Sequence, residues 1–204
     1  MSKTSRTWLR RHVTDPYVHR ARSEGYRSRA AYKLLEIDAR DRLLRPGFWV
    51  VDLGAAPGSW SQVAANKVGA AGRVLALDLL PLVPLAGIET IQGDFREQAI
   101  VDVLSELLQG RKLDLVLSDL APNLSGVAVS DQARMMHLAE CVLEFAAAHL
   151  KPGGDLLVKV FEGAGMAELR RAMREVFSKI EVRKPDSSRR ESAEMYLLAR
   201  ARRA

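Results

Sequence analysis

The sequence predicts an α/β fold in which a mostly parallel sheet of seven strands carries helices on both faces. Apolar runs of strand length alternate with segments of helical periodicity between residues 48 and 177, which is typical of parallel sheets. A glycine turn joins the first apolar run to the helix after it. The last two strand-like segments have no helix between them, so we expect them to form an antiparallel hairpin at one edge.

The N-terminal part of the chain is expected to be an arm followed by a helix. Residues 1–25 are basic and show no clear period, and the arm is taken to extend to about residue 27. Ser28 is expected to cap a helix from Arg29 to Leu44, because serine at this position accepts a hydrogen bond from a free backbone amide. The dipeptide Pro46-Gly47 is expected to end that helix.

The other elements follow from apolar patterning and turn residues. We expect strands at residues 48–54, 73–80, 88–95, 112–120, 155–161, 180–185 and 194–200. We expect helices at residues 59–67, 96–108, 131–150 and 166–177, the longest of them ended by Lys151-Pro152-Gly153-Gly154. With no repeat or long linker, residues 1–204 should form one domain, and open sheets of this kind hold ligands outside the carboxyl ends of the strands.

The composition argues against a membrane, secreted or metal-binding protein. No apolar run reaches the roughly 18–20 residues of a membrane span, and no apolar stretch follows the basic N-terminus as in a secretory signal. Cys141 is the single cysteine, which fits a reducing cytoplasm. The four histidines show no metal-ligand spacing with Cys, Asp or Glu. We expect a cytoplasmic protein without a metal site, and a monomer.

Positive charge is concentrated at the two ends of the chain. The net charge is +6, and the balances are +7 for residues 1–45, −5 for residues 46–182 and +4 for residues 183–204. If the fold brings the two ends together, they form one surface suited to a phosphate backbone; otherwise they are solvated tails. Aromatic residues that can stack on bases interleave with the first basic segment, and charge therefore favours a nucleic-acid partner.

The stretch VVDLGAAPGSW (50–60) combines a strand, a tight glycine turn and a helix start. Gly54 and Gly58 allow the backbone to approach a ligand closely, although a generic strand-to-helix turn would look similar. The spacing departs from the G-x-G-x-x-G of dinucleotide-binding dehydrogenases. Pro57 also lacks an amide donor, which makes a pyrophosphate cradle less favourable.

Acidic residues end three of the expected strands. Asp78 lies 20 residues beyond Gly58, where a carboxylate can accept hydrogen bonds from ribose hydroxyls, and Asp94 and Asp119 end the next two strands. Such a crevice disfavours phosphates and favours a ligand with hydroxyls, an amine and a positive charge. Any one of these residues could be an ordinary turn or helix cap. Together with the glycine loop, the set predicts S-adenosylmethionine (SAM) as cofactor.

Lys159 interrupts the apolar stretch GGDLLVKVFEG (153–163), which has the pattern of a buried strand. Lysine is rarely buried without a partner or a task. Its position in a strand interior therefore favours a functional role.

Seven segments resemble, in order, the signatures of the FtsJ/RrmJ-type ribose 2′-O-methyltransferases, and the match is closest to the bacterial RlmE branch. They are SRAAYKLLEI, DLGAAPGSWSQVA, LALDLLP, IQGDFRE, LVLSDLAPNLSG, LLVKVFEG and RKPDSSRRESAEMYLLAR. The resemblance covers roughly residues 15–200, with Ser59 as a small departure where relatives commonly carry glycine. It implies a Rossmann-like SAM-dependent methyltransferase fold and methylation of a uridine ribose in the 23S ribosomal RNA, with the assembled 50S subunit as substrate.

The resemblance also implies site residues. A Lys-Asp-Lys-Glu catalytic tetrad would fall on Lys33, Asp119, Lys159 and Glu194. Contacts to SAM would fall on Gly58, Trp60, Asp78, Asp94 and Asp119, beside the Gly54 of the glycine loop. The reaction would be an in-line displacement in which the ribose 2′-oxygen attacks the methyl carbon, so the protein must align two reactants and handle one proton. Lys159 would either accept that proton or position the oxygen.

Each site residue also has an ordinary structural interpretation. Lys33 could pair with Glu36 on a solvated helix face, Asp119 could cap a turn, and Glu194 could pair with a loop arginine such as Arg190. Trp60 is more often a core residue than a ligand platform. The residues alone do not choose between these interpretations.

Three other functions remain open at this point. A methyltransferase of another RNA, such as a transfer RNA or a messenger cap, would share the tetrad. A non-catalytic RNA-binding factor of ribosome assembly would not need it. A Rossmann dehydrogenase is disfavoured by the missing glycine pattern. For the methyltransferase, the basic arm and the loop from Lys184 to Arg190 are the expected contacts to the RNA backbone.

Overall fold

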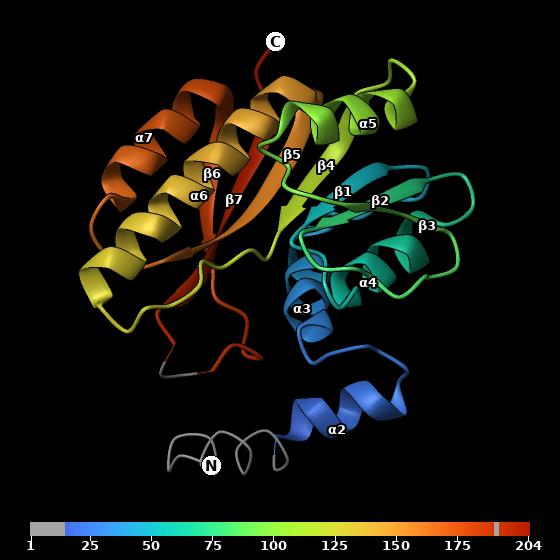
Figure 1. The fold of residues 1–204 in the computed structure, drawn as a ribbon, viewed down its shortest axis with the longest axis horizontal. Coiled ribbons are helices and arrows are strands. Elements are labelled where there is room, and N and C mark those ends of the chain that lie inside the picture. Colours follow the sequence, from blue (N-terminus) through green and yellow to red (C-terminus); the bar gives the residue numbers. More distant parts are fainter. Residues whose placement is uncertain (1–14, 190–191) are drawn as a thin grey trace.

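The structure, a computed structural model, describes residues 15–189 and 192–204 (Figure 1). Its sheet has seven strands in the order β3-β2-β1-β4-β5-β7-β6. The strands are β1 (Trp49–Leu53), β2 (Arg73–Asp78), β3 (Ile88–Gln92), β4 (Leu113–Ser118), β5 (Leu150–Phe161), β6 (Phe177–Arg183) and β7 (Glu194–Arg202). The first five are parallel, and β7 runs antiparallel to both β5 and β6. The predicted fold class is confirmed, including the antiparallel hairpin.

Helices cover both faces of the sheet (Figure 1). They are α2 (Pro16–Ser23), α3 (Ala31–Asp41), α4 (Ser59–Val68), α5 (Gln98–Leu108), α6 (Ala128–His149) and α7 (Met166–Val176). Apolar residues of α3 and α4 form one buried cluster with the sheet. Those of α5, α6 and α7 form a second cluster on the opposite face.

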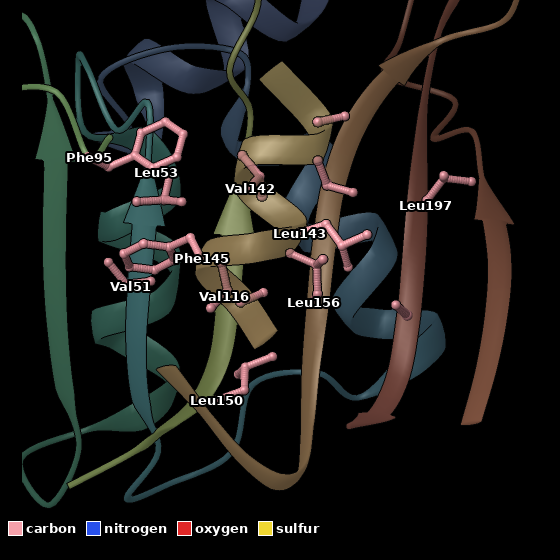
Figure 2. Close-up of a cluster of buried hydrophobic side chains, with 14 of the residues drawn as sticks. Val51, Leu53, Phe95, Val116, Val142, Leu143, Phe145, Leu150, Leu156 and Leu197 are labelled. Carbon is pink, nitrogen blue, oxygen red and sulfur yellow. The ribbon is translucent and has the colours of Figure 1, made fainter. Parts of the chain in front are cut away.

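The larger cluster lies where α6 crosses the middle of the sheet (Figure 2). Phe145 of α6 packs edge-on against Phe95, with ring centroids 5.9 Å apart. Val116 and Leu156 of the central strands are fully buried beneath this helix. Burying a side chain of this size stabilises a protein by roughly 1.5–3 kcal/mol. The centre of the sheet is therefore well packed and supports the side chains at the carboxyl ends of its strands.

The prediction of an arm without regular structure was wrong for residues 16–23, which form α2. Asp15 caps this helix by accepting a hydrogen bond from the Tyr17 amide at 3.0 Å, and Pro16 occupies the first helical turn. The helix is stabilised by contacts with a distant segment, since the rings of Tyr17 and Tyr32 lie 5.4 Å apart and Arg29 pairs with Asp15. Of the rest of the predicted arm, residues 1–14 lie outside the described residues.

Other boundaries also differ from those expected, and two of them have a visible cause. Helix α3 ends at Asp41, not at Leu44, because Arg42 adopts a left-handed conformation (φ 53°) and the Leu44 amide turns back to Asp38 Oδ1 at 2.8 Å. Strand β5 begins at Leu150, so the segment expected to end the preceding helix belongs to the strand. Leu150 pairs with Leu113 across a register irregularity in β4, a contact that local turn residues do not indicate.

Helix α3 is tied to the hairpin by a buried ion pair. Arg183 of β6 donates from Nε and Nη2 to the two carboxylate oxygens of Asp41, each at 2.6 Å. Only 7% and 8% of the two side chains are exposed. Arg200 of β7 donates to the backbone carbonyl of Asp41 at 2.5 Å. The end of α3 is thus fixed to both strands of the hairpin.

Removing one partner of this pair should destabilise the fold more than removing both. Asp41→Ala leaves the buried Arg183 guanidinium with Glu181 as its remaining carboxylate partner, 3.0 Å away, and should lower the free energy of unfolding by about 3 kcal/mol, the low end of the range for a broken buried pair. The double variant Asp41→Leu/Arg183→Met should recover most of that loss. Urea unfolding measures both, and Lys179→Ala, at an exposed lysine of β6, is the control. Equal destabilisation by the single and double variants would contradict the expectation.

Candidate functional site

Four predicted residues converge at the carboxyl end of the central strands. Lys33 comes from α3, Asp119 follows β4, Lys159 is in β5 and Glu194 begins β7. Strands β5 and β7 are antiparallel with Lys159 opposite Tyr196. Since side chains two residues apart share one face of a strand, Glu194 lies on the same face as Tyr196, next to Lys159.

The four side chains alternate in charge and touch in sequence. Lys33 Nζ donates to Glu194 Oε1 at 2.5 Å. Lys159 Nζ lies 3.8 Å from Glu194 Oε2 and 3.1 Å from Asp119 Oδ1, and it donates to the Asp119 backbone carbonyl at 2.7 Å. Between 8% and 18% of each side chain is exposed. The cluster is therefore accessible from one side and is otherwise enclosed.

The structure bears on the ordinary ion pairs that the sequence offered for Lys33 and Glu194. Lys33 pairs with Glu194, whereas Glu36 accepts a hydrogen bond from the Ser187 amide at 3.1 Å. The alternative partner of Glu194, Arg190, lies outside the described residues. Glu194 does accept from the Ser188 hydroxyl at 3.3 Å.

Tyr196 is a residue of the site that the sequence reasoning missed. Its hydroxyl donates to Asp119 Oδ1 at 2.7 Å and lies 3.4 Å from Glu194 Oε1. Lys33 Nζ lies 5.9 Å from the centre of its ring. Burial, and then the charges of Asp119 and Glu194, raise the pKa of Tyr196 well above its ordinary value, so the hydroxyl remains a donor. Strand alternation from Glu194 could have indicated it.

Asp52 is a second missed residue, buried beneath the site in β1. Its Oδ2 accepts from the Ser61 hydroxyl at 2.6 Å, and its Oδ1 has no hydrogen-bond partner among the described residues. Burial raises the pKa of Asp52 to about 7, against the lowering effect of the Ser61 hydrogen bond, and the charges of Asp119 and Asp78 raise it further.

A cavity of about 330 Å³ opens next to the tetrad, at the ends of β1, β2 and β4. Gly54, Asp78 and Asp94 line it, together with Leu120, the neighbour of Asp119. Gly54 has φ +77°, and a Cβ there would lie 2.5 Å from a methyl carbon of Leu120, so only glycine fits. The volume of the cavity falls in the range of ligand pockets, about 300–1,000 Å³.

The two cavity carboxylates are partly engaged. Asp78 accepts hydrogen bonds from the amides of Ala56 and Leu80, both at 2.8 Å, one through each oxygen. Asp94 pairs with Arg96, whose hydrogen bonds lower the pKa of the Asp94 carboxyl and keep it ionised. A carboxylate has about four acceptor sites, so Asp78 retains capacity for ligand hydroxyls. Asp94 already accepts four contacts from the backbone amide and guanidinium of Arg96, and a ligand hydroxyl would have to replace one of them. Apolar side chains supply much of the remaining lining, together with the polar residues Arg96, Asn123, Arg134 and His137. The residues present fit a nucleoside-like cofactor.

Three of the predicted cofactor residues do not line this cavity. Gly58 is the N-cap of α4, and Asp119 belongs to the tetrad. Trp60 is 2% exposed and donates from Nε1 to the Ala30 carbonyl at 2.8 Å. Its side chain is thus a core residue, as the ordinary interpretation held, and any contact of Trp60 with a cofactor would have to use its backbone.

The two basic ends of the chain meet only in part. Arg29 bonds to the Ser187 carbonyl, and a polar cavity of about 270 Å³ beside the tetrad is lined by both segments, including Arg29 and Arg189. However, β7 runs away from this edge. Arg200 pairs with Asp155, and Arg202 donates to the Ala147 carbonyl, both at the other end of the sheet. The predicted single positive surface is therefore smaller than its charge count suggested.

Comparison with known proteins decides the family. The model of the family described as FtsJ-like methyltransferase matches residues 26–202. The chain belongs to the FtsJ-like methyltransferase family. Two relatives are named ribosomal RNA large subunit methyltransferase E. The Azoarcus protein is 61% identical over 197 residues, 97% of this chain and 96% of that protein. The Neisseria meningitidis serogroup C protein is 55% identical over 202 residues, 99% and 98% of the two chains.

Solved structures share the Rossmann-like fold of this FtsJ-like chain. A provisionally assigned ribosomal RNA methyltransferase from Plasmodium falciparum superposes with a TM-score of 0.78 at 28% identity, covering 87% of this chain and 98% of that one. Aeropyrum pernix fibrillarin in complex with SAM has a TM-score of 0.57 at 17% identity, covering 85% and 75%. At that identity, fibrillarin shows the fold alone.

Within residues 15–189 and 192–204, no helix is both long enough and apolar enough to cross a membrane. In the same residues, no cluster of three or more His, Cys, Asp or Glu side chains is arranged to hold a metal ion.

The Asp52 carboxyl should make stability depend on pH. Because its pKa rises from 3.8 to about 7 on folding, the folded protein binds this proton more tightly. The contribution of this proton to the free energy of unfolding is complete below about pH 4 and is lost as the pH rises to about 7. The contribution amounts to at most about 4 kcal/mol. Asp52→Asn cannot titrate, so its free energy of unfolding relative to wild type should increase from pH 4.5 to 8 in urea titrations. Parallel pH curves for the two proteins would contradict this.

Proposed function

We propose that this protein transfers a methyl group from SAM to the 2′-oxygen of a uridine ribose in 23S ribosomal RNA, at the stage of the assembled 50S subunit. The observation that carries the proposal is the enclosed Lys-Asp-Lys-Glu cluster beside a cavity with carboxylates for ribose hydroxyls. The names of the near full-length relatives support a large-subunit ribosomal RNA as the substrate.

The cavity residues would hold the cofactor through distinct groups. Asp78 and Asp94 would accept hydrogen bonds from its hydroxyl or amino groups, and Gly54 would allow close backbone approach. When bound, SAM supplies a methyl group that is already activated by the positive charge on its sulfur. The apolar part of the lining would exclude water from the reacting atoms, which strengthens the electrostatic interactions there.

The tetrad would orient the ribose hydroxyl. An ammonium group has three donors and no acceptor, and Lys159 Nζ faces two oxygens of Asp119 and one of Glu194. We propose that Lys159 exchanges one of these contacts for the ribose 2′-oxygen and directs a lone pair towards the methyl carbon. Lys33 holds Glu194 in place, and Tyr196 holds Asp119. As the new carbon–oxygen bond forms, the 2′-proton would pass to water and the thioether product S-adenosylhomocysteine would leave.

RNA would approach over the polar cavity next to the tetrad. Ser28, Arg29 and Arg189 line it together with Lys33, so positive charge lies where a phosphate backbone would have to pass. Basic residues of α2, Arg20 and Arg22, extend this region along the same end of the molecule.

Lys159→Ala should remove methyl transfer and leave cofactor binding. We expect activity to fall by about 100-fold or more, while SAM affinity measured by calorimetry stays within about threefold. Lys179→Ala, which removes an exposed lysine, should change neither. Near-wild-type turnover of Lys159→Ala would rule out the assigned role.

Lys159→Arg separates positioning from proton acceptance. A guanidinium still donates hydrogen bonds but does not accept a proton in proteins. If Lys159 positions the oxygen, Lys159→Arg should retain more activity than Lys159→Ala in the same assay. Equal loss in the two variants would assign proton removal to Lys159 instead.

The substrate is tested by mapping ribose methylation in cells. Deletion of the gene should remove one 2′-O-methyluridine from 23S ribosomal RNA, and the wild-type gene, but not the Lys159→Ala variant, should restore it. Assays with purified 50S subunits and with naked RNA should show preference for the subunits. An unchanged ribosomal methylation map, with a methyl group lost from another RNA, would favour the second candidate substrate class.

A further inference from the structure

Arg27, between α2 and α3, joins two loops that are distant in sequence. Its Nη1 donates to the carbonyls of Pro57 at 2.8 Å and Val83 at 2.7 Å, and its Nη2 donates to the Pro84 carbonyl at 3.0 Å. Pro57 belongs to the glycine loop (54–58), and the other two belong to the loop after β2 (79–87). A guanidinium has several donors in a rigid fork, so one arginine can bridge three carbonyls.

Both loops border the cofactor cavity. The glycine loop begins at Gly54 and the 79–87 loop begins at Leu79, and both residues line the cavity. Asp78 connects the loops at this inner end, because its carboxylate accepts from the amides of Ala56 and Leu80. Arg27 connects them at the outer end. The two loops are therefore held together at two places, one inside the cavity and one outside it.

The 79–87 loop has little other support in the structure. It contains no helix or strand, and Leu79, Leu80 and Val83 are 63–71% exposed. Segments with so little buried apolar surface open easily. The junction itself is closely fitted, since a Cβ on Gly58 would lie 2.8 Å from Leu85 Cδ1 and 3.1 Å from Arg27 Nη1.

The same segment reaches the catalytic side of the site. The Arg27 amide donates to Gln62 Oε1 at 2.9 Å, and the hydroxyls of Ser28 and Ser59 lie 2.8 Å apart. These contacts fix the start of the α3 segment against α4. Lys33 follows six residues after Arg27, so a single stretch of chain contacts the cofactor loops and carries a tetrad residue.

We propose that Arg27 is a positioning residue that holds the 79–87 loop against the glycine loop and thereby sets the affinity of the cavity for its cofactor. The inference rests on the proposed function, which takes that cofactor to be SAM. Arg27 acts on binding because its contacts are with the two loops that border the cavity and not with the tetrad. Its loss should open the outer end of the cavity while Asp78 still joins the inner end.

The test compares Arg27→Ala and Arg27→Lys with wild type. We expect the Kd for SAM and for S-adenosylhomocysteine, measured by calorimetry, to rise about tenfold in both variants. The KM for SAM should rise in parallel, with kcat within about threefold of wild type. Arg27→Lys should not rescue, because lysine lacks the rigid two-nitrogen fork through which Arg27 reaches the three carbonyls. Amides of residues 79–87 should exchange hydrogen faster in both variants.

Arg174→Ala is the matched control. It removes the same charge from an exposed position in the last turn of α7 and should leave the affinity for SAM unchanged. If Arg27→Ala instead weakens RNA binding with a changed salt dependence and leaves SAM affinity intact, Arg27 is an RNA contact and the inference is overturned. If the wild-type protein does not bind SAM, the proposed function is wrong. That result comes from wild type alone and is therefore distinct from failure of the inference about Arg27.

Discussion

The burial of one ammonium group is the constraint on which the site depends. Among the described lysines, Lys159 alone is buried, and its strand neighbours Val158 and Val160 are in the apolar core on the opposite face of the sheet. An unpaired charge in such a place costs several kcal/mol. Asp119, from the end of β4, and Glu194, from the start of β7, supply the balancing charges. Each strand beside β5 thus contributes one acid.

The direction of β7 follows from the same requirement. Glu194 is the first residue of β7, and it meets the carboxyl end of β5 only because the two strands are antiparallel. A parallel β7 would place Glu194 at the far end of the sheet and leave Lys159 with one carboxylate. The antiparallel direction also brings Tyr196 beneath Lys33. The same direction places Arg200 and Arg202 at the other end of the sheet. There they bond to Asp155 and to the Ala147 carbonyl, away from the site.

The segment around α3 connects the separate parts of the molecule. Arg27 precedes the helix and contacts the two loops of the cofactor cavity. Lys33 lies within it and completes the tetrad. Asp41 ends it and is anchored to the hairpin by Arg183 and Arg200. One short segment thus contacts the loops of the proposed cofactor cavity, carries a tetrad residue and is anchored to the hairpin.

The sequence by itself determined the α/β class, the succession of strands and helices, and the misfit of Lys159 in an apolar strand. These follow from local periodicity, which each segment carries in its own residues. Resemblance, and not periodicity, selected Lys33 and Glu194. Only the tertiary structure decided that Tyr196 bonds to Asp119, that Asp52 is buried beneath the site, and that residues 16–23 are a helix. Each of these depends on segments far apart in the chain, and which of them meet is set by strand order and direction, which no local pattern encodes.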